Sequence, residues 1–297
     1  MAYSLSRRQM MKLSAGALLA AQLWPGRARA ADAATKPLKF IVVNDLHYVE
    51  DSCAPFFEGM VKACNKIEGA GLVLVVGDLV DGGTAGQCHA IHDILAGLKM
   101  PYYVTAGNHD PLSQNDRGPW ESVFGDALNV SFEREGWQFV GMDTSDGKKV
   151  SGFDCHQETL DFAAALPGKL ERSKPTFVYT HFPLGPGVSL RLRNADALLE
   201  PFKQLNVAAI FNGHYHAFTQ KTALNSALVT TNVCCSHMRA NHDGTFEKGF
   251  FVIEAAEGRW KRTFVEYGTD FPGSATPNDK PRPATRPAVK DPSAPSF

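Results

Sequence analysis

The chain has 297 residues, of which 44% are hydrophobic and 21% charged, an ordinary globular composition with enough apolar material for a sizeable core. Its formal net charge is −1 at pH 7 and it contains no run of basic residues, so the sequence does not indicate a nucleic-acid-binding surface. The six cysteines show no CxxC spacing, which disfavours a zinc site built from thiolates and leaves any disulfide pairing open.

Residues 1–30 have the three-part pattern of an export signal. A basic start is followed by an apolar run from about Leu13 to Leu23, too short to span a bilayer, and by a small-residue ending at Ala30. The segment SRRQMMK closely resembles the twin-arginine signal, which exports folded proteins; an ordinary secretory signal is the alternative. We therefore expect cleavage after Ala30, the twin-arginine translocase as a partner during export, and a periplasmic or secreted bacterial protein.

The remainder of the chain is expected to form one domain and a tail. Removing residues 1–30 takes away five basic residues and no acidic residue, so the formal charge changes from −1 to −6. No later segment is long and apolar enough to cross a membrane. Residues 272–297 contain seven prolines among few apolar residues, which predicts a disordered tail. We expect one folded domain over residues 31–271, and its oligomeric state is left open.

Residues 38–110 alternate buried strands with amphipathic helices. The apolar runs LKFIVV, LVLVV and YYVTA predict strands, and the segments PFFEGMVKACNKIEGAG and AGQCHAIHDILAGL between them predict helices. The order strand–helix–strand–helix–strand implies a parallel sheet with right-handed crossovers.

The second half of the chain is less regular. Residues 129–143 predict a hairpin that turns at Glu135–Gly136. The other expected elements are helices over 155–170 and 194–206, strands over 175–182 and 207–216, and a hairpin over 249–267.

Five predicted strands end, at their carboxyl side, in side chains that can bind a metal ion. The residues at these ends are Asp45 and His47, then Asp78, then Asn108, His109 and Asp110, then His181, and finally His214 and His216. Each motif alone is commonly a solvated turn, but ligands bind at this edge of open α/β sheets, so their occurrence together indicates a site. In the two pairs with i, i+2 spacing, an extended backbone places both side chains on one face.

Together, these motifs resemble those of the calcineurin-like metallophosphoesterase superfamily, over residues 38 to about 255. The resemblance implies a four-layer α/β/β/α sandwich with two metal ions at the carboxyl edges of its central sheets. It also implies which residues hold the ions. The first ion would be held by Asp45, His47, Asp78 and His216, and the second by Asp78, which bridges both, with Asn108, His181 and His214.

The chemistry of these side chains agrees with a binuclear site. Mixed imidazole and carboxylate ligands suit Mn, Fe or Zn ions. Two such ions can activate a bridging hydroxide, which attacks the phosphorus atom of a phosphate ester without a Ser or Cys nucleophile. The family role of His109 is to protonate the leaving alkoxide, and Asp110 is expected to orient its ring. Purple acid phosphatases have a tyrosine three residues after the bridging aspartate; here that position is Asp81, so a tyrosinate–iron site is not expected.

The expected function is hydrolysis of a small-molecule phosphate ester. The segment THFPLGPGVSLRLRNADALLEPF is similar to the corresponding loop of the cyclic-nucleotide phosphodiesterase branch, which favours phosphodiesters. Phosphomonoester hydrolysis is the alternative, and a non-catalytic metal-binding scaffold is a rival from a different class. Three loop arginines, Arg117, Arg191 and Arg193, are candidates for contact with phosphate oxygens, against the simpler interpretation of solvated loop side chains.

Overall fold

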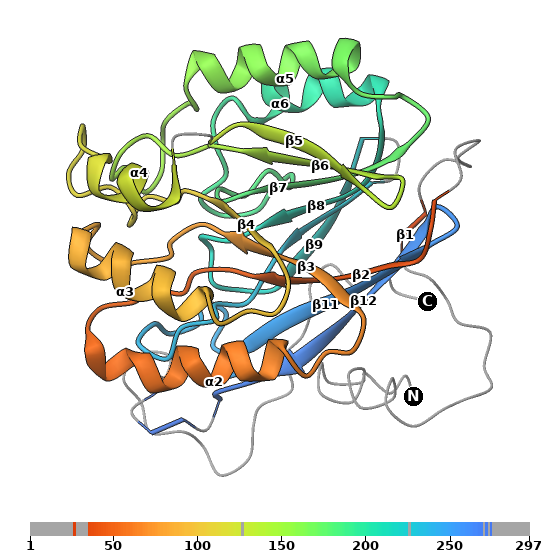
Figure 1. The fold of residues 1–297 in the computed structure, drawn as a ribbon. Coiled ribbons are helices and arrows are strands. Elements are labelled where there is room, and N and C mark those ends of the chain that lie inside the picture. The colour runs from red at the N-terminus through yellow and green to blue at the C-terminus, as the bar shows by residue number, and fades with distance from the viewer. Residues whose placement is uncertain are drawn as a thin grey trace, which may run out of the picture.

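The computed structural model describes residues 26–27, 35–125, 128–224, 227–269, 271–272 and 274. Most of the predicted export signal and of the predicted tail lies outside these residues, so both stay predictions. Within the described residues, two six-stranded sheets pack face to face between two layers of helices (Figure 1). This confirms the predicted four-layer α/β/β/α sandwich.

The first sheet contains the predicted parallel strands. Its order is β1-β12-β11-β2-β3-β4, with β1 (Gly26–Arg27), β12 (Arg259–Glu266), β11 (Gly249–Ala256), β2 (Leu38–Val43), β3 (Ala70–Val76) and β4 (Tyr102–Thr105). Strands β2, β3 and β4 are parallel, and β11 joins β2 antiparallel. Helices α2 (Ala54–Cys64) and α3 (Ala85–Leu95) connect the parallel strands, and α3 begins with a Thr84–Gln87 capping box.

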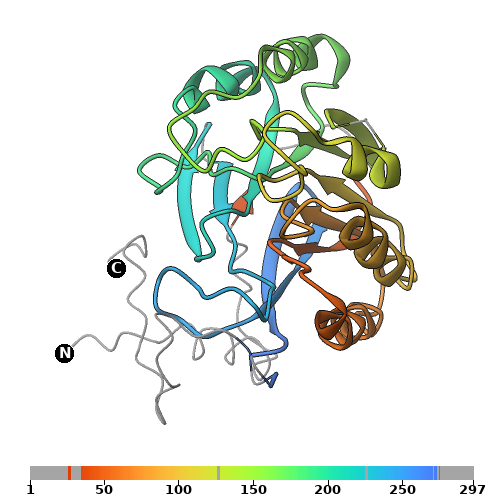
Figure 2. The same cartoon turned by 90° about the vertical axis from the view of Figure 1, so that its left-hand side faces the viewer.

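The second sheet has the order β5-β6-β7-β8-β10-β9. Its strands are β5 (Val130–Arg134), β6 (Trp137–Met142), β7 (Pro175–Thr180), β8 (Asn206–Asn212), β10 (Ala227–Thr231) and β9 (Thr219–Ala223). Strands β5 and β6 form the predicted hairpin, and β6, β7, β8 and β10 run parallel. Its outer face is covered by α5 (Gln157–Lys169) and α6 (Ala195–Leu199), as Figure 2 shows from the side.

Three features differ from the predicted elements. The helix expected over 194–206 is α6 followed by the 3-10 helix η2 (Glu200–Gln204), and Pro201, which lacks an N–H, lies at the start of η2. The sequence analysis did not delimit the β9–β10 pair or the short helix α4 (Gly118–Phe124). A further short 3-10 helix, η1 (Asp51–Cys53), precedes α2.

Alternating side chains of the central strands form separate hydrophobic cores. On β2, Phe40 and Val42 point between the two sheets, whereas Ile41 and Val43 pack under α2 and α3. The ring of Phe40 lies 5.0 Å from that of Phe177 on the opposite sheet, in an edge arrangement. Each fully buried side chain of this size stabilises the fold by about 1.5–3 kcal/mol. A third core joins the second sheet to α5 and α6.

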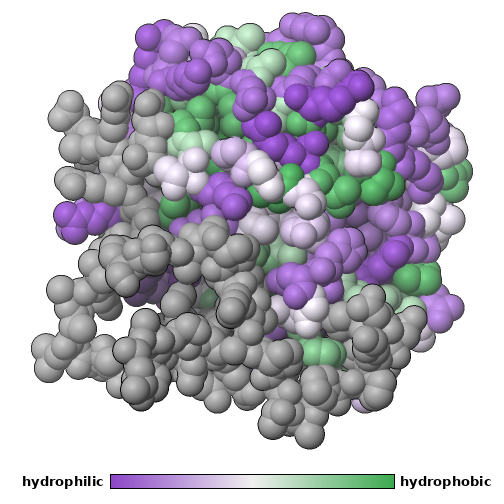
Figure 3. All heavy atoms as spheres, turned by 180° about the vertical axis from the view of Figure 1, so that it is seen from behind, coloured by the Kyte–Doolittle hydropathy of each residue, from purple (hydrophilic) through white to green (hydrophobic). Residues whose placement is uncertain are grey.

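The surface carries both hydrophilic and hydrophobic residues. Seen from behind, hydrophilic residues alternate with smaller hydrophobic patches (Figure 3). Among the described residues, no helix combines the length and the apolar character needed to cross a membrane.

The six cysteines are buried and unpaired, at positions 53, 64, 88, 155, 234 and 235. They therefore act as small buried side chains of the core and the loops.

Candidate metal centre

The predicted ligands of the two i, i+2 pairs lie in loops with a left-handed backbone, so the expectation that these pairs are extended is wrong. Five of the residues just after the strands have a positive φ: Asp45 (52°), His47 (48°), Asp78 (51°), His214 (65°) and His216 (47°). Residues other than glycine rarely adopt this left-handed conformation, and such residues cluster at functional sites. The backbone thus turns sharply at the end of β2, β3 and β8 and directs these side chains into one space between the sheets.

Glycines of the same motifs leave room for the ligands. A Cβ atom on Gly107 would lie 2.2 Å from Asp78 Oδ1, and one on Gly77 would lie 2.2 Å from His181 Nδ1. A Cβ atom on Gly213 would lie 2.7 Å from Asp45 Oδ2. These distances are shorter than the contacts that Cβ atoms make in proteins. A residue other than glycine at any of the three positions would therefore displace the neighbouring ligand.

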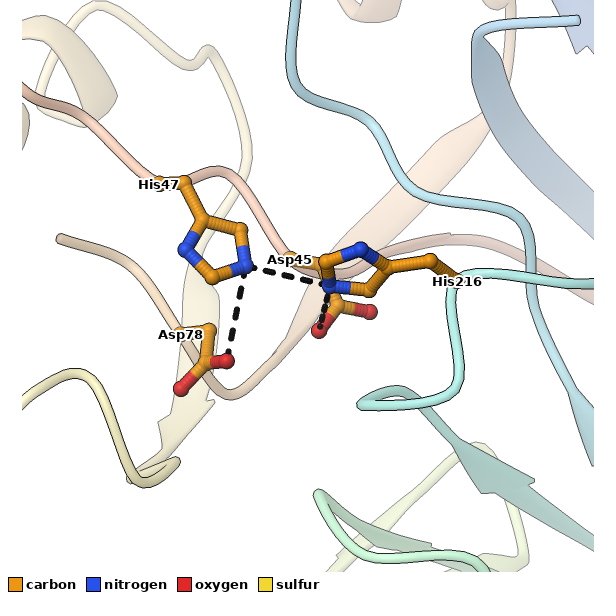
Figure 4. A group of neighbouring side chains, drawn as sticks. All are labelled: Asp45, His47, Asp78 and His216. Carbon is orange, nitrogen blue, oxygen red and sulfur yellow. Dashed lines mark hydrogen bonds and ion pairs between the residues drawn. The ribbon is translucent and has the colours of Figure 1, made fainter. Parts of the chain in front are cut away.

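The first group of side chains brings together four residues from three strand ends. Asp45, His47, Asp78 and His216 are all buried, and one potential ligand atom of each lies within 4.8 Å of the others (Figure 4). His47 Nε2 is 3.4 Å from Asp78 Oδ2 and 3.1 Å from His216 Nε2. His216 Nε2 is 3.3 Å from Asp45 Oδ1. These are the four residues that the family resemblance assigns to the first ion.

The second group shares Asp78 with the first. Asp78, His181 and His214 lie within the same 4.8 Å limit, and His181 Nε2 is 3.3 Å from Asp78 Oδ2. Asn108 follows β4 and is 3% exposed, and its Oδ1 has no hydrogen-bond partner among the described residues. A buried amide oxygen without a partner is costly, and a metal ion would satisfy it. Asp78 is therefore the residue that the two groups share.

Hydrogen bonds to the backbone select the nitrogen of each ring that is free to bind a metal. His214 Nε2 lies 2.8 Å from the carbonyl oxygen of Val150, which leaves Nδ1 available. His181 Nδ1 lies 3.2 Å from the carbonyl oxygen of Val76, and its Nε2 faces Asp78. Such bonds fix the ring orientation and tautomer of metal-binding histidines.

The electrostatics of the site also suit metal binding. Burial lowers the pKa of His47 to about 4 and that of His214 to about 3, so both rings are neutral at pH 7, the form that binds a metal. Burial would also lower the pKa of His181, but the Asp78 and Asp45 carboxylates raise it to about 9. Carboxylate, amide and imidazole donors in this mixture suit Zn, Mn or Fe ions, so the residues fit the two implied ions.

His109 contacts Asp81 rather than the predicted Asp110. The Nδ1 atom of His109 lies 3.3 Å from Asp81 Oδ1 and 3.0 Å from the Asp81 carbonyl oxygen. Asp110 instead accepts hydrogen bonds from the backbone N–H groups of Leu79, Val80 and Gly107, at 2.8, 3.1 and 2.7 Å. The prediction that Asp110 orients His109 is therefore wrong: the side chain of Asp110 turns back onto its own loop and the loop after β3.

Asp81 is a residue of the site to which the sequence analysis assigned no role. Burial would raise the pKa of Asp81, but hydrogen bonds from His109, His47 and Arg239 hold it well below its usual range. The pKa of His109 is raised by Asp81 and Asp78 despite the opposing effect of burial. The position of Asp81, three residues after Asp78, was visible in the sequence; Arg239 stands in no recognisable motif.

The three candidate substrate arginines are all engaged elsewhere. Arg117 Nη1 lies 2.6 Å from Asp143 Oδ2, and Arg117 also lines a cavity of about 420 Å³ beside α4. Arg191 pairs with Asp196 at 2.5 Å and Arg193 with Asp154 at 3.0 Å. These carboxylates neutralise the guanidinium groups, so the contacts do not support the predicted role in binding phosphate.

Comparison with known proteins agrees with the geometry. The sequence model of the family described as calcineurin-like phosphoesterase matches residues 38–218. A protein of Arcobacter nitrofigilis named "Probable glycerophosphodiester phosphodiesterase GpdQ" is 28% identical over 197 residues, which cover 62% of this chain and 70% of the relative. A Synechococcus protein named "Probable cyclic nucleotide phosphodiesterase" is 27% identical over 215 residues, 67% of this chain and 81% of the relative.

Solved structures show the same fold at low sequence identity. A dimetal phosphatase from Danio rerio superimposes with a TM-score of 0.57 and 14% identity, covering 77% of this chain and 99% of that one. A purple acid phosphatase from yellow lupin gives a TM-score of 0.53 and 12% identity, covering 84% of this chain and 57% of that one.

Proposed function

We propose that this chain, which belongs to the calcineurin-like phosphoesterase family and is a metal-dependent phosphoesterase, hydrolyses phosphodiesters at a binuclear metal centre whose two ligand groups would share Asp78. The observation that carries the proposal is the convergence of two buried ligand groups on Asp78. When bound, the two ions would supply Lewis-acid stabilisation of the phosphoryl oxygens and an acidified water as nucleophile.

The chain's own residues supply the geometry of the reaction. The buried carboxylates of Asp45 and Asp78 would offset the charge of bound cations and hold them. The rings of His181 and His214 are locked by the carbonyls of Val76 and Val150, so the ligands need little rearrangement when a substrate binds. Such preorganisation is a major source of rate enhancement in enzymes.

The contacts of His109 support a role as the general acid. Its ring packs edge-on against His47 with centroids 4.6 Å apart, and its backbone N–H donates to Asp78 Oδ1 at 2.8 Å. With Nδ1 directed at Asp81, Nε2 is the atom that can give a proton to the leaving alcohol. A positioned proton donor contributes about 10²–10⁴-fold in rate.

Two observations favour diesters over monoesters. Both curated relatives have names that specify a phosphodiesterase. The loop between His181 and α6 also resembles the cyclic-nucleotide phosphodiesterase branch in sequence. Phosphomonoester hydrolysis at the same centre is the second candidate. A non-catalytic scaffold is disfavoured because both ligand groups and His109 are present.

The test is metal analysis paired with two assays on the purified protein. We expect about two Mn, Fe or Zn ions per chain and faster turnover of bis-p-nitrophenyl phosphate than of p-nitrophenyl phosphate. Preference for the monoester would reassign the protein as a phosphatase. Two bound ions without turnover of either ester would favour the scaffold, and failure to bind metal would overturn the ligand assignment.

We further propose export through the twin-arginine route, supported by the sequence of residues 6–12. Cleavage after Ala30 would remove β1, a two-residue strand that pairs with β12 at the sheet edge. The test is the amino-terminal sequence of the protein recovered outside the cytoplasm, compared with an Arg7→Lys, Arg8→Lys double variant. Unchanged export of the double variant would point to an ordinary secretory signal.

A further inference from the structure

The segment between β10 and β11, residues 232–248, forms a loop beside the metal centre, although it lies beyond the family match at 38–218. The backbone N–H of Cys235 donates to the carbonyl of Asn44 at 3.1 Å, and that of His242 donates to the carbonyl of His216 at 3.2 Å. The Sγ of Cys234 donates to the carbonyl of Asp45 at 3.3 Å. The loop is thus bonded to the ligand-bearing segments after both β2 and β8.

A buried lysine fixes the middle of this loop. Lys248 is 1% exposed, and its Nζ donates to the carbonyl oxygen of Arg239 and to Asn241 Oδ1, the latter at 3.2 Å. Asn241 Nδ2 in turn donates to Thr245 Oγ1 at 3.0 Å and to the carbonyl of Glu247 at 2.8 Å. This network holds the backbone of Arg239 in one place.

The side chain of Arg239 reaches from the loop to Asp81. Its Nε lies 3.1 Å from Asp81 Oδ1, and its Nη2 contacts the same oxygen. That oxygen is also 3.0 Å from His47 Nδ1 and 3.3 Å from His109 Nδ1. One carboxylate oxygen therefore joins the guanidinium to a metal-ligand histidine and to the proton donor.

We propose that Arg239 is a positioning residue of the phosphoesterase reaction, which holds Asp81 so that the rings of His47 and His109 keep their orientation. A carboxylate on an eight-residue loop would otherwise be free to rotate away from one ring or the other. The guanidinium restricts that rotation because two of its N–H groups contact one oxygen. The inference rests on the proposed function only where it concerns His109 as the proton donor.

The kinetic test uses leaving groups of different acidity. Metal-loaded Arg239→Ala is compared with the unaltered protein on bis-p-nitrophenyl phosphate, whose nitrophenol leaves readily, and on glycerophosphoethanolamine, whose alcohol leaves poorly. The kcat for the alkyl ester should fall about tenfold, the usual scale for a residue that supports an active group. The kcat for the nitrophenyl ester should fall by less than about threefold, because an acidic phenol needs little proton donation.

Two variants accompany this comparison. Arg239→Lys keeps the charge and one contact and should restore part of the lost kcat. Arg172→Ala is the matched control, since Arg172 donates from Nε to the Pro167 carbonyl at the far end of α5. A raised KM on both esters would make Arg239 a substrate contact and overturn the inference. Equal losses of kcat on both esters, with a lower unfolding temperature, would show that Arg239 supports only the stability of the fold.

A second readout does not depend on activity. In ¹⁵N-histidine spectra of the zinc-loaded protein, Arg239→Ala should shift the ring signals of His47 and His109, whereas Arg172→Ala should not. Unchanged signals in Arg239→Ala would overturn the inference even in an active enzyme. If the unaltered protein hydrolyses neither ester, the proposed function fails, and the ring signals still decide the role of Arg239.

Discussion

The two sheets of the sandwich contribute different chemistry to the metal centre. The loops after β2, β3 and β4 of the first sheet supply every carboxylate and the amide, namely Asp45, Asp78 and Asn108, together with His47. The loops after β7 and β8 of the second sheet supply imidazoles only: His181, His214 and His216. Neither ligand group that contains Asp78 is complete on one sheet, because His216 joins the group of Asp45 and His47, and His181 and His214 join Asp78.

This division explains why the hydrophobic packing between the sheets matters to the chemistry. The aromatic cluster around Phe40 and Phe177 sets the separation of the two sheets, and the ligands meet only at that separation. Close-packed interiors transmit small displacements. The site is thus a property of the interface between the sheets, and the following experiments test the two contributions separately.

The largest effect is expected from the first sheet, at the residue common to both ligand groups. Asp78→Asn should lower turnover by about 10³-fold or more, because it removes several kcal/mol of metal-dependent stabilisation. Metal content should fall for both ions. The matched control is Asp161→Asn on the exposed face of α5, where the carboxylate accepts from Gln157. Loss of one ion only would show that Asp78 is not shared.

A variant of His109 tests the first sheet without replacing a predicted metal ligand. His109→Gln should lower turnover by about 10²–10⁴-fold, because the proton donor is lost. Both ions should stay bound, because the metal ligands are unchanged. Turnover and elemental analysis measure the two quantities on one preparation. His92→Gln on α3 is the control, since His92 contacts Asp93. Full activity in His109→Gln would remove the general-acid role.

The variant Gly107→Ala tests whether the first sheet tolerates one extra methyl group beside Asp78. Gly107→Ala places a Cβ 2.2 Å from Asp78 Oδ1, so the carboxylate or the loop must move, at a cost of about 1–3 kcal/mol. We expect weaker zinc binding by calorimetry and a lower unfolding temperature. In the control Gly71→Ala, the new Cβ is 3.5 Å from Leu38 Cδ1, an ordinary contact. Equal zinc affinity in both variants would contradict the crowding argument.

The smallest expected effect concerns the second sheet and the proton that His181 carries in the metal-free protein. Its pKa of about 9 means that the ring is protonated at pH 7 in the metal-free protein, whereas a ligand ring must be neutral. Zinc binding at pH 7 should therefore release about one proton from this residue. The release should disappear as the pH rises above about 9. Calorimetry in two buffers of different ionisation enthalpy measures it, and identical enthalpies would contradict the prediction.

Local sequence patterns predicted most of the fold. The continuous apolar runs of β2, β3, β7 and β8, which are buried on both faces, and the helices between them follow from local sequence, and the Glu135–Gly136 turn defined a hairpin. The β9–β10 pair was harder to delimit because β10 pairs in parallel with β8, and no local pattern records a partner strand. Pro201 was visible in the sequence, and its missing N–H is consistent with the change from the α-helix that begins at Ala195 to a 3-10 helix at Glu200.

The sequence by itself determined which side chains stand at the strand ends, because the carboxyl ends of parallel strands share one edge of a sheet and the motifs mark those ends. The packing of the two sheets then brought their two edges together. The tertiary structure alone decided what supports these side chains. His109 is adjacent to Asp110 in the chain but contacts Asp81, and Arg239 reaches Asp81 across 158 residues. Such contacts depend on how the loops pack over the sheets, and spacing along the chain carries no record of that packing.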